Sequence, residues 1–299
     1  MNPGRRFALI TFLTWLPTGL YVAPLVLLML DRGLSVPTIA AVGIAYSLTT
    51  ALLELPTGGL ADVIGRRAVL LASCAASLAS LVMLGFATTA IVFAVSSFLR
   101  GVARALGSGP AEAWYVDTVH AVQGPDAPIG KGLAHGQVAS SAGLAIGTIT
   151  GGLIPLAFTG VVAVPLAIPV FAAAAVEAVR FFVIITAMPE PRSRDERGSG
   201  GGLPGRLRGL GPRAVGRTVR DGLRLARFDP VLLRLVAITG CLGIMLATIE
   251  LLTPPWLATV TGTFETAGIA YAIVAALGFA ASAVGSSLSP RVVHRRAIL

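Results

Sequence analysis

The sequence predicts an all-α integral membrane protein, and three observations support this class. Hydrophobic residues make up 55% of the 299 residues, and charged residues make up only 12%. The mean hydropathy is +0.83. Apolar runs of about 20 residues, the length that a helix needs to cross a bilayer, follow one another along the chain. Because soluble domains carry roughly 25% charged residues, this chain has too little charge to cover a water-facing surface.

The first four spans are separated by short charged or turn-forming segments. The first apolar run follows Arg5-Arg6 as a secretory signal would, but it is long and no small-residue cleavage site ends it. It is therefore a retained span. The run 68–99 carries no charge and is too long for one crossing, so we expect a hairpin at 85–89. The expected spans are 7–30, 36–60, 68–84 and 90–109.

The second part of the chain predicts four more spans around a basic linker. The stretch 133–176 has no acidic or basic residue except His135 and breaks near 158–160, which gives two spans ending at about Met188. Residues 189–234 hold eleven arginines and a glycine-rich run, and we expect a linker there. Its part 213–228 has arginines at helical spacing and could form an amphipathic surface helix. Spans seven and eight are expected at 235–257 and 267–288.

The distribution of basic residues predicts the orientation of these spans. With the N-terminus inside, the outer segments hold a single basic residue, Arg32, and the inner segments hold nearly all the others. This asymmetry follows the positive-inside rule, so we expect a multi-pass protein of the cell membrane with a cytoplasmic N-terminus. Lys131 is the only lysine, and this arginine bias indicates GC-rich codon usage and a bacterial source. The net charge of +9 reflects orientation, and we expect no nucleic acid partner.

Residues 58–70 form a short charged segment with glycines between two apolar runs. The pattern G-x-L-A-D-x-x-G-R-R-x-x-L resembles the signature loop of the major facilitator superfamily, a family of secondary transporters. It matches at Gly58, Leu60, Ala61, Asp62, Gly65, Arg66 and Arg67 and departs at Val63, where the family usually has a basic residue. The resemblance implies a cytoplasmic gating loop that opens and closes during alternating access. The alternative is an ordinary anchoring loop.

A second match lies in span five, at Gly143, Gly147, Gly151 and Gly152. This spacing resembles the antiporter motif of proton-coupled drug exporters in the same family, with Thr148 in place of the usual proline. Glycines four residues apart let another helix approach closely, and such spacing is common in any membrane bundle. The resemblance implies export, and general helix packing is the alternative.

Four charged residues inside the spans are candidates for proton coupling or for the substrate cavity. Arginine is costly at membrane depth and normally faces a cavity or a carboxylate. Arg100 resembles the span-four arginine that the family associates with proton coupling, and a structural ion pair is the alternative. Glu177 and Arg180 lie one helical turn apart and could neutralise each other. Glu250 has no basic residue in its own span, so we expect it to bind a proton or a cationic substrate.

Acidic residues near the inner ends of spans two and four form a further candidate group. Glu54 ends span two, and Glu112 and Asp117 follow span four in the string S-G-x-x-E-A-W-x-x-D. This string resembles that of a subset of bacterial major facilitator permeases. We expect a cytoplasmic charge network that includes Asp62. Trp114 and Tyr115 in the string fit an interfacial aromatic anchor equally well.

The overall expectation is a major facilitator-type helical bundle. It comprises an N-terminal six-helix half at 1–188, a cytoplasmic linker at 189–234, and the first two spans of a second half at 235–299. Because the family builds two six-span halves, the resemblance implies a twelve-span protein that is truncated here after the eighth span. A complete protein of this type is expected to be a monomer.

The expected function is secondary active transport, with proton-coupled export of a small molecule as the first choice. An uptake permease of the same fold is one alternative, and a non-transporting truncated membrane protein is another. No phosphate-binding loop, metal-ligand spacing or catalytic constellation occurs in the sequence. We therefore expect no enzyme activity, no cofactor and no metal, with a small-molecule substrate, protons and the lipid bilayer as partners.

Overall fold

The computed structural model describes residues 2–189 and 230–296, and every regular element in these ranges is helical. Eight stretches are long and apolar enough to cross a membrane, so the all-α membrane class is confirmed. The expected surface helix at 213–228 lies outside the described residues. The elements are α1 (Pro3–Asp31), α2 (Val36–Ile64), α3 (Arg66–Phe86), α4 (Ala90–Gly107), α5 (Pro110–Gln123), α6 (Gly130–Ala157), η1 (Pro165–Ala167), α7 (Ile168–Ala187), α10 (Pro230–Thr261) and α11 (Phe264–Arg296).

The charged segment after span two is shorter than we expected. Helix α2 continues through Gly58 and Asp62 to Ile64, and α3 begins at Arg66. Only Gly65 separates them. Its φ of 96° is a backbone conformation that residues with a Cβ rarely adopt. The expectation of an aqueous loop that begins at Gly58 was therefore wrong. The preceding residues all fit a helix, and the one required turn needs a single glycine.

The residues after span four form a separate helix that the sequence did not predict. Helix α4 ends at Gly107, Gly109 has φ of 92°, and α5 begins with Pro110. Proline is well placed there because the first residue of a helix needs no N–H donor. The ring of Tyr115 stacks on Phe7 with centroids 4.9 Å apart, and Trp114 Nε1 donates to the Pro189 carbonyl at 3.0 Å. These contacts hold α5 against the start of α1 and the end of α7.

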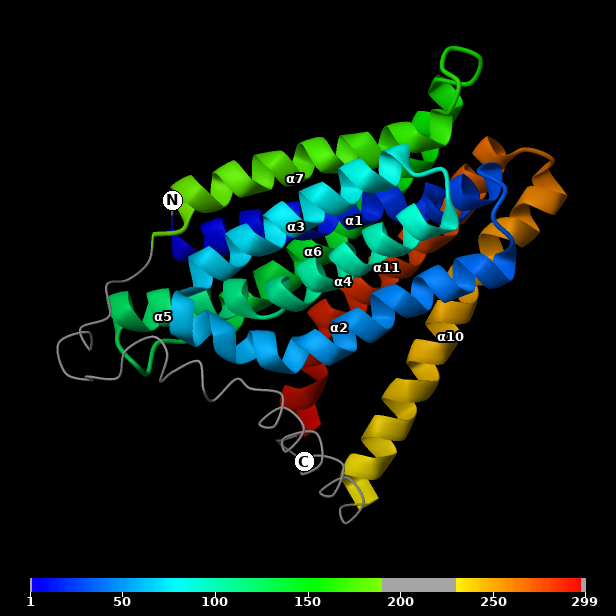
Figure 1. Cartoon of the computed structure of the whole chain (residues 1–299). Coiled ribbons are helices and arrows are strands. Elements are labelled where there is room, and N and C mark those ends of the chain that lie inside the picture. The colour runs from blue at the N-terminus through cyan, green and yellow to red at the C-terminus, as the bar shows by residue number, and fades with distance from the viewer. Residues whose placement is uncertain (1, 190–229, 297–299) are drawn as a thin grey trace.

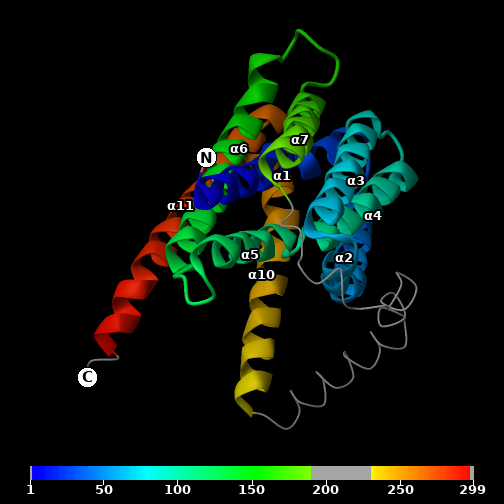
Figure 2. The same cartoon turned by 90° about the vertical axis from the view of Figure 1, so that its left-hand side faces the viewer.

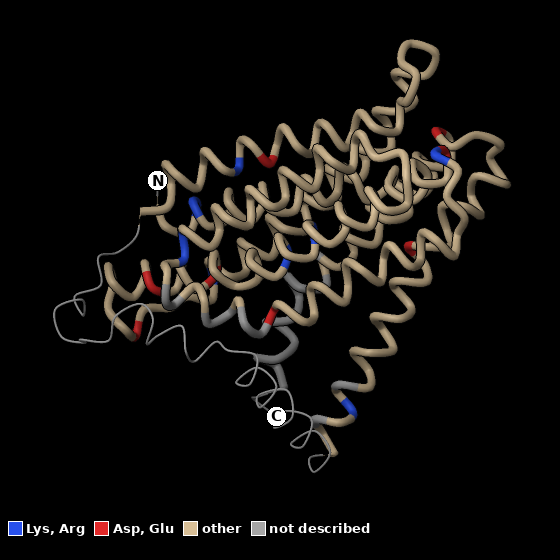
Figure 3. Tube along the Cα trace, in the orientation of Figure 1, with Lys and Arg blue, Asp and Glu red and all other residues tan. Residues whose placement is uncertain are grey.

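The helices form one bundle in which distant parts of the chain lie side by side (Figures 1 and 2). Helix α1 packs along α6 and α7, α3 packs on α4 and α7, and α2 packs on α4. Helix α11 lies against α6, while α10 contacts mainly α11 and leans away from the bundle (Figure 1). We call the end of the bundle that carries Gly65, Gly109 and Pro189 the Gly65 end. Charged residues gather towards it, and few lie along the middles of the helices (Figure 3).

Glycines on α6 allow the closest helix contacts in the structure. A Cβ on Gly147 would lie 2.5 Å from the Leu16 carbonyl oxygen and 2.9 Å from Gly19 Cα. A Cβ on Gly143 would lie 2.8 Å from the Phe12 oxygen, and one on Gly151 would overlap the Leu20 carbonyl. Gly143, Gly147 and Gly151 therefore form one face of α6, which touches the backbone of α1.

Gly152 allows the same close helix contact with α11. Its missing side chain leaves room for Gly268 and Ala272 of α11, since an added Cβ would lie 2.5 Å from Ala272 Cβ. The glycine motif thus brings α6 against α1 on one side and against α11 on the other. Close packing of this kind is the main attraction between helices in a bilayer.

Buried hydroxyl groups join α3 and α4. Ser80 Oγ donates to the Ser96 carbonyl at 2.8 Å, and Ser96 Oγ donates back to the Ser80 carbonyl at 3.0 Å. Ser73 Oγ donates to the Ala103 carbonyl at 2.7 Å. These hydrogen bonds fix the register of α4, which carries Arg100.

We predict that Gly147→Ala destabilises the protein, whereas Gly43→Ala does not. Gly147 has no room for a Cβ, and Gly43, in the first third of α2, has no atom within 4 Å of one. Overpacking costs typically about 1–3 kcal/mol, and alanine in an open helix position gains up to about 1 kcal/mol. The thermal unfolding midpoint of the purified variants measures both effects. Equal midpoints for the two variants would show that the α1–α6 contact is looser than described.

Candidate functional site

A polar cavity of about 80 Å³ lies among α1, α2, α3, α4 and α7. Three of the four predicted intramembrane charges line it, namely Arg100, Glu177 and Arg180, and Arg104 joins them. Glu250 is not part of its lining. The other lining residues are small, hydroxyl-bearing or aromatic: Thr14, Trp15, Pro17, Thr18, Tyr21, Tyr46, Ser73, Ser77, Ala103 and Gly107.

Arg100 is held in this cavity by aromatic rings. Its guanidinium carbon lies 5.2 Å from the Tyr21 ring centroid and 5.0 Å from the Tyr46 ring centroid. Its Nη2 donates to Ser97 Oγ at 3.3 Å. Its Nη1 is buried and has no hydrogen-bond partner among the described residues. A buried guanidinium nitrogen without an acceptor is costly, so it marks a position that another group can occupy.

Arg104 lies one turn further along α4 and stacks over the Trp15 ring at 4.7 Å. Among the carboxylates whose side chains the structure describes, none forms an ion pair with either arginine. Cation–π contacts stabilise both guanidinium groups without removing their charge. The structural ion pair considered for Arg100 inside the N-terminal half is therefore absent from these residues.

Glu250 is within electrostatic range of Arg100, although no ion pair joins the two side chains in the structure. It lies in the middle of α10, and Arg100 is the cation that acts on its carboxylate. The Tyr46 and Tyr271 hydroxyl groups are also within electrostatic reach of Glu250. Two helices of the first set, α2 and α4, therefore face α10 and α11 across a small group of polar side chains.

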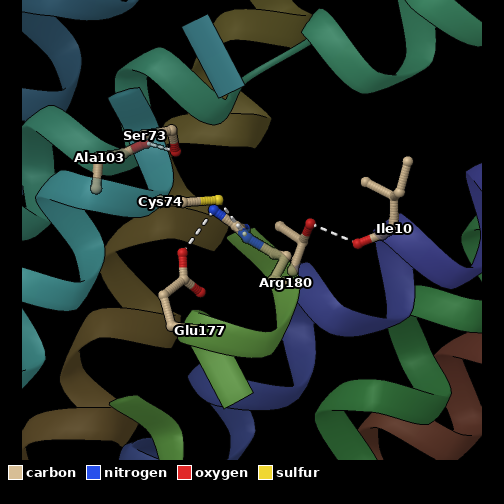
Figure 4. A network of polar contacts seen from close by, with 7 residues as sticks. Ile10, Ser73, Cys74, Ala103, Glu177 and Arg180 are labelled. Carbon is tan, nitrogen blue, oxygen red and sulfur yellow. Dashed lines mark hydrogen bonds and ion pairs between the residues drawn. The ribbon is translucent and has the colours of Figure 1, made fainter. Parts of the chain in front are cut away.

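Glu177 and Arg180 form a buried ion pair within α7, with Oε1 and Nη2 2.7 Å apart. Arg180 Nε also points at Cys74 Sγ of α3, 3.1 Å away (Figure 4). In the same view Ser73 of α3 reaches the Ala103 carbonyl of α4. The two buried charges compensate each other, and the Arg180–Cys74 contact ties α7 to α3.

Several of the predicted inner charges meet at the Gly65 end. Ser108 Oγ donates to Glu54 Oε1 at 2.7 Å, and Arg66 Nε pairs with Asp117 Oδ2 at 2.8 Å. Arg67 Nη2 donates to the Ile185 carbonyl of α7 at 2.6 Å. Glu112 is exposed in the first turn of α5. Asp62 lies in the last turn of α2, but its side chain is outside the described residues.

Sequence reasoning missed the aromatic residues of the site, Trp15, Tyr21 and Tyr46. Their only signal was the presence of aromatic rings in otherwise aliphatic spans. Which face of α1 and α2 these rings occupy depends on how the two helices pack against α4. The contact of Cys74 with Arg180 has no sequence signal either.

We predict that the Glu177–Arg180 pair is structural and that its two charges depend on each other. Arg180→Gln leaves the Glu177 carboxylate buried without its partner, and breaking a buried pair costs about 3–5 kcal/mol. The double variant Glu177→Gln/Arg180→Gln removes both charges and is expected to lose less. The unfolding midpoints of the three proteins test this order. A double variant less stable than Arg180→Gln would contradict mutual compensation.

Comparison with solved structures shows the same fold in a known transporter. The crystal structure of the nucleoside transporter NupG matches with a TM-score of 0.72 and 13% identity, covering 99% of this chain and 68% of that one. A point mutant of NupG matches with a TM-score of 0.64 and 14% identity, covering 92% of this chain and 65% of that one. This chain therefore spans about two thirds of the length of these transporters.

No curated protein matched the sequence of this chain. The identity to NupG is too low to carry over a substrate, so these structures show the fold alone. The family model described as Major Facilitator Superfamily matches residues 7–299. With its eight membrane-length helical stretches and its fold, the chain belongs to the Major Facilitator Superfamily.

Proposed function

We propose that this chain is a secondary active transporter that couples movement of a small molecule to protons by alternating access. The observation that carries the proposal is the position of Arg100. It has no carboxylate partner among the described residues of its own half, and the charge that faces it, Glu250, comes from the second set of helices. An electrostatic interaction of this kind between α4 and α10 links the relative position of the two helices to the protonation of one carboxylate.

The coupling step follows from electrostatics at membrane depth. While Glu250 is ionised, it attracts Arg100 and favours the arrangement in which α10 lies near α4. Protonation of Glu250 removes this attraction, and the helix sets can then separate at lower cost. A proton that binds one arrangement better than the other shifts the population between them, which is what a coupled transporter requires.

The Gly65 end supplies the proposed gate. Gly65 is the sharp turn between α2 and α3, Arg66 joins α3 to Asp117 of α5, and Arg67 joins α3 to the carbonyl end of α7. The Glu54–Ser108 bond adds a tie between α2 and α4. We propose that these contacts, with Asp62, make and break as the inner side closes and opens. In this proposal the Gly65 end faces the cytoplasm of a bacterium, with the chain in the cell membrane.

Two directions of transport fit this coupling, and export is the first. The resemblance of Gly143, Gly147, Gly151 and Gly152 to the antiporter motif supports it. Uptake is the second candidate, and one observation favours it. Thr148, at the position of the motif's proline, donates to the Leu144 carbonyl of its own helix at 2.7 Å, and α6 runs without a break from Gly130 to Ala157. The kink that a proline would introduce is absent.

We predict that Glu250→Gln abolishes proton binding linked to transport. Reconstituted protein on a solid-supported membrane, given a pH jump without substrate, should displace charge as Glu250 gains or loses its proton. Glu265→Gln is the matched control, because Glu265 is an acidic residue in the first turn of α11, outside the site. An undiminished signal in Glu250→Gln would exclude Glu250 as the coupling group.

Direction is tested with cells that express the full chain and are loaded with the neutral dye Nile red. Export predicts dye loss that stops when an uncoupler collapses the proton gradient. Glu250→Gln is expected to lower the rate at least about tenfold, as a difference of 1.4 kcal/mol in the barrier would. Dye loss that is insensitive to the uncoupler would contradict proton-coupled export of this dye.

A further inference from the structure

The polar cavity carries more positive than negative charge. Three arginines line it, namely Arg100, Arg104 and Arg180, and Glu177 is the only carboxylate in its lining. Glu177 is already used, because it pairs with Arg180 at 2.7 Å. Arg100 and Arg104 remain, and Glu250 from α10 can balance at most one of them. Excess positive charge in a membrane interior has to be balanced, which an anion entering from outside could do.

The way in which the arginines are held leaves their donors available. The Tyr21, Tyr46 and Trp15 rings interact with the guanidinium groups through their π systems, so they accept few of the N–H bonds. The buried Nη1 of Arg100 has no acceptor among the described residues. A guanidinium group presents its donors in a planar fork whose shape matches a carboxylate.

Two of the hydroxyl groups around the cavity are already used. Thr14 Oγ1 donates to the Ile10 carbonyl at 2.7 Å, and Ser73 Oγ donates to the Ala103 carbonyl at 2.7 Å. With Glu250 ionised, Arg100 and Arg104 leave one positive charge without a carboxylate, which matches a monoanion better than a dianion such as phosphate. The volume of about 80 Å³ suits one small head group and leaves the rest of a ligand in the mouth of the cavity.

We propose that the cavity binds the carboxylate of a small organic monoanion, which accepts hydrogen bonds from Arg100 and is attracted by Arg104. The inference rests on the proposed transport function, since it names the chemical class of its substrate. Glu250 supports it directly, because this carboxylate already acts on Arg100 from across the two helix sets. The substrate carboxylate competes with Glu250 for the charge of the same guanidinium group.

This competition couples the anion to a proton. An ionised Glu250 competes with the anion for Arg100, and a protonated Glu250 does not. Anion and proton therefore bind together, which corresponds to uptake driven by an inward proton gradient and favours the second direction given above. The charged and titratable groups that face this site from α1, α2, α4, α7, α10 and α11 are Tyr21, Tyr46, Arg100, Arg104, Glu177, Arg180, Glu250 and Tyr271.

Calorimetric titration of the full chain in lipid nanodiscs tests the proposal. The ligands are benzoate, the neutral benzamide and the cationic benzylammonium, which share a ring and differ in charge. We expect benzoate to bind at least about tenfold more tightly than the other two, a difference of roughly 1.4 kcal/mol. Equal affinity for benzamide, or preference for benzylammonium, would overturn the proposal, and this comparison needs no variant.

Variants then locate the site. Arg100→Gln should weaken benzoate binding at least about tenfold, and Arg100→Lys, which keeps the charge but loses the planar fork, should lie between. Lys131→Gln removes an exposed cation in the first turn of α6 and is the matched control. Each variant is first checked for a single cooperative unfolding transition, which shows that it is folded. Undiminished benzoate affinity in folded Arg100→Gln or Arg100→Lys would place the anion elsewhere and overturn the assignment.

The pH dependence separates this inference from the proposed function. In the wild type, benzoate affinity is expected to rise as pH falls, and all measurements are made above about pH 5.5 so that benzoate itself stays ionised. Glu250→Gln should bind benzoate with an affinity that no longer depends on pH. Benzoate binding that requires Arg100, together with no proton signal after a pH jump, would leave the anion site standing and reject proton coupling. A proton signal without benzoate binding would support proton coupling and reject the anion site.

Discussion

Charges inside the bilayer have to be balanced by the protein itself, because the hydrocarbon core supplies neither water nor counter-ions. The chain meets this constraint in three ways. Glu177 and Arg180 balance each other within one turn of α7. Arg104 lies against the Trp15 ring. Arg100 lies between two tyrosine rings and faces Glu250 from the other set of helices. Only the last arrangement depends on how the two sets are placed, and this makes it suited to drive a conformational change.

Helices α1, α6 and α11 pack closely, whereas α10 makes few contacts. The glycine face of α6 brings it against α1, and Gly152 brings the same helix against α11. Helix α10, which carries Glu250, contacts mainly α11 and has few contacts with α2. Arg100 lies on the well-packed α4 and Glu250 on the loosely packed α10, so their electrostatic interaction acts between a fixed helix and one that few contacts hold in place. The contacts at the Gly65 end lie far from this pair along the helices and form the proposed gate.

The spans and the family could be predicted from the sequence because both depend on local patterns. Apolar runs bounded by charges identify helices of membrane length, and the motif around Gly65 identifies the family. The pair of Glu177 and Arg180 also follows from helical spacing. The short α5 was missed, because a polar string after Gly109 is equally compatible with a loop. The exact position of the turn at Gly65 was missed because glycine and charged residues, which are typical of loops, also occur in the last turns of α2.

The environment of Arg100 could not be predicted, because it is produced by tertiary contacts. Tyr21, Tyr46 and Glu250 come from three other helices, and no spacing along the chain relates them. The sequence could only indicate that an arginine at this depth needs a partner. The substitutions of Val63 for a basic residue and of Thr148 for proline in the two motifs are a second example. Their effect on transport depends on tertiary structure, which the sequence pattern does not contain.

The central claim is that Arg100 and Glu250 interact across the two sets of helices, and a double-mutant cycle tests it most directly. The cycle compares the free energy of unfolding of the wild type, Arg100→Gln, Glu250→Gln and the double variant in one lipid environment. Interacting charges predict that the double variant differs from the sum of the single variants by about 1 kcal/mol or more, within the range of roughly 0.5–3 kcal/mol measured for contacting residues. Strictly additive losses would show that the two charges do not interact, and the coupling account would then be wrong.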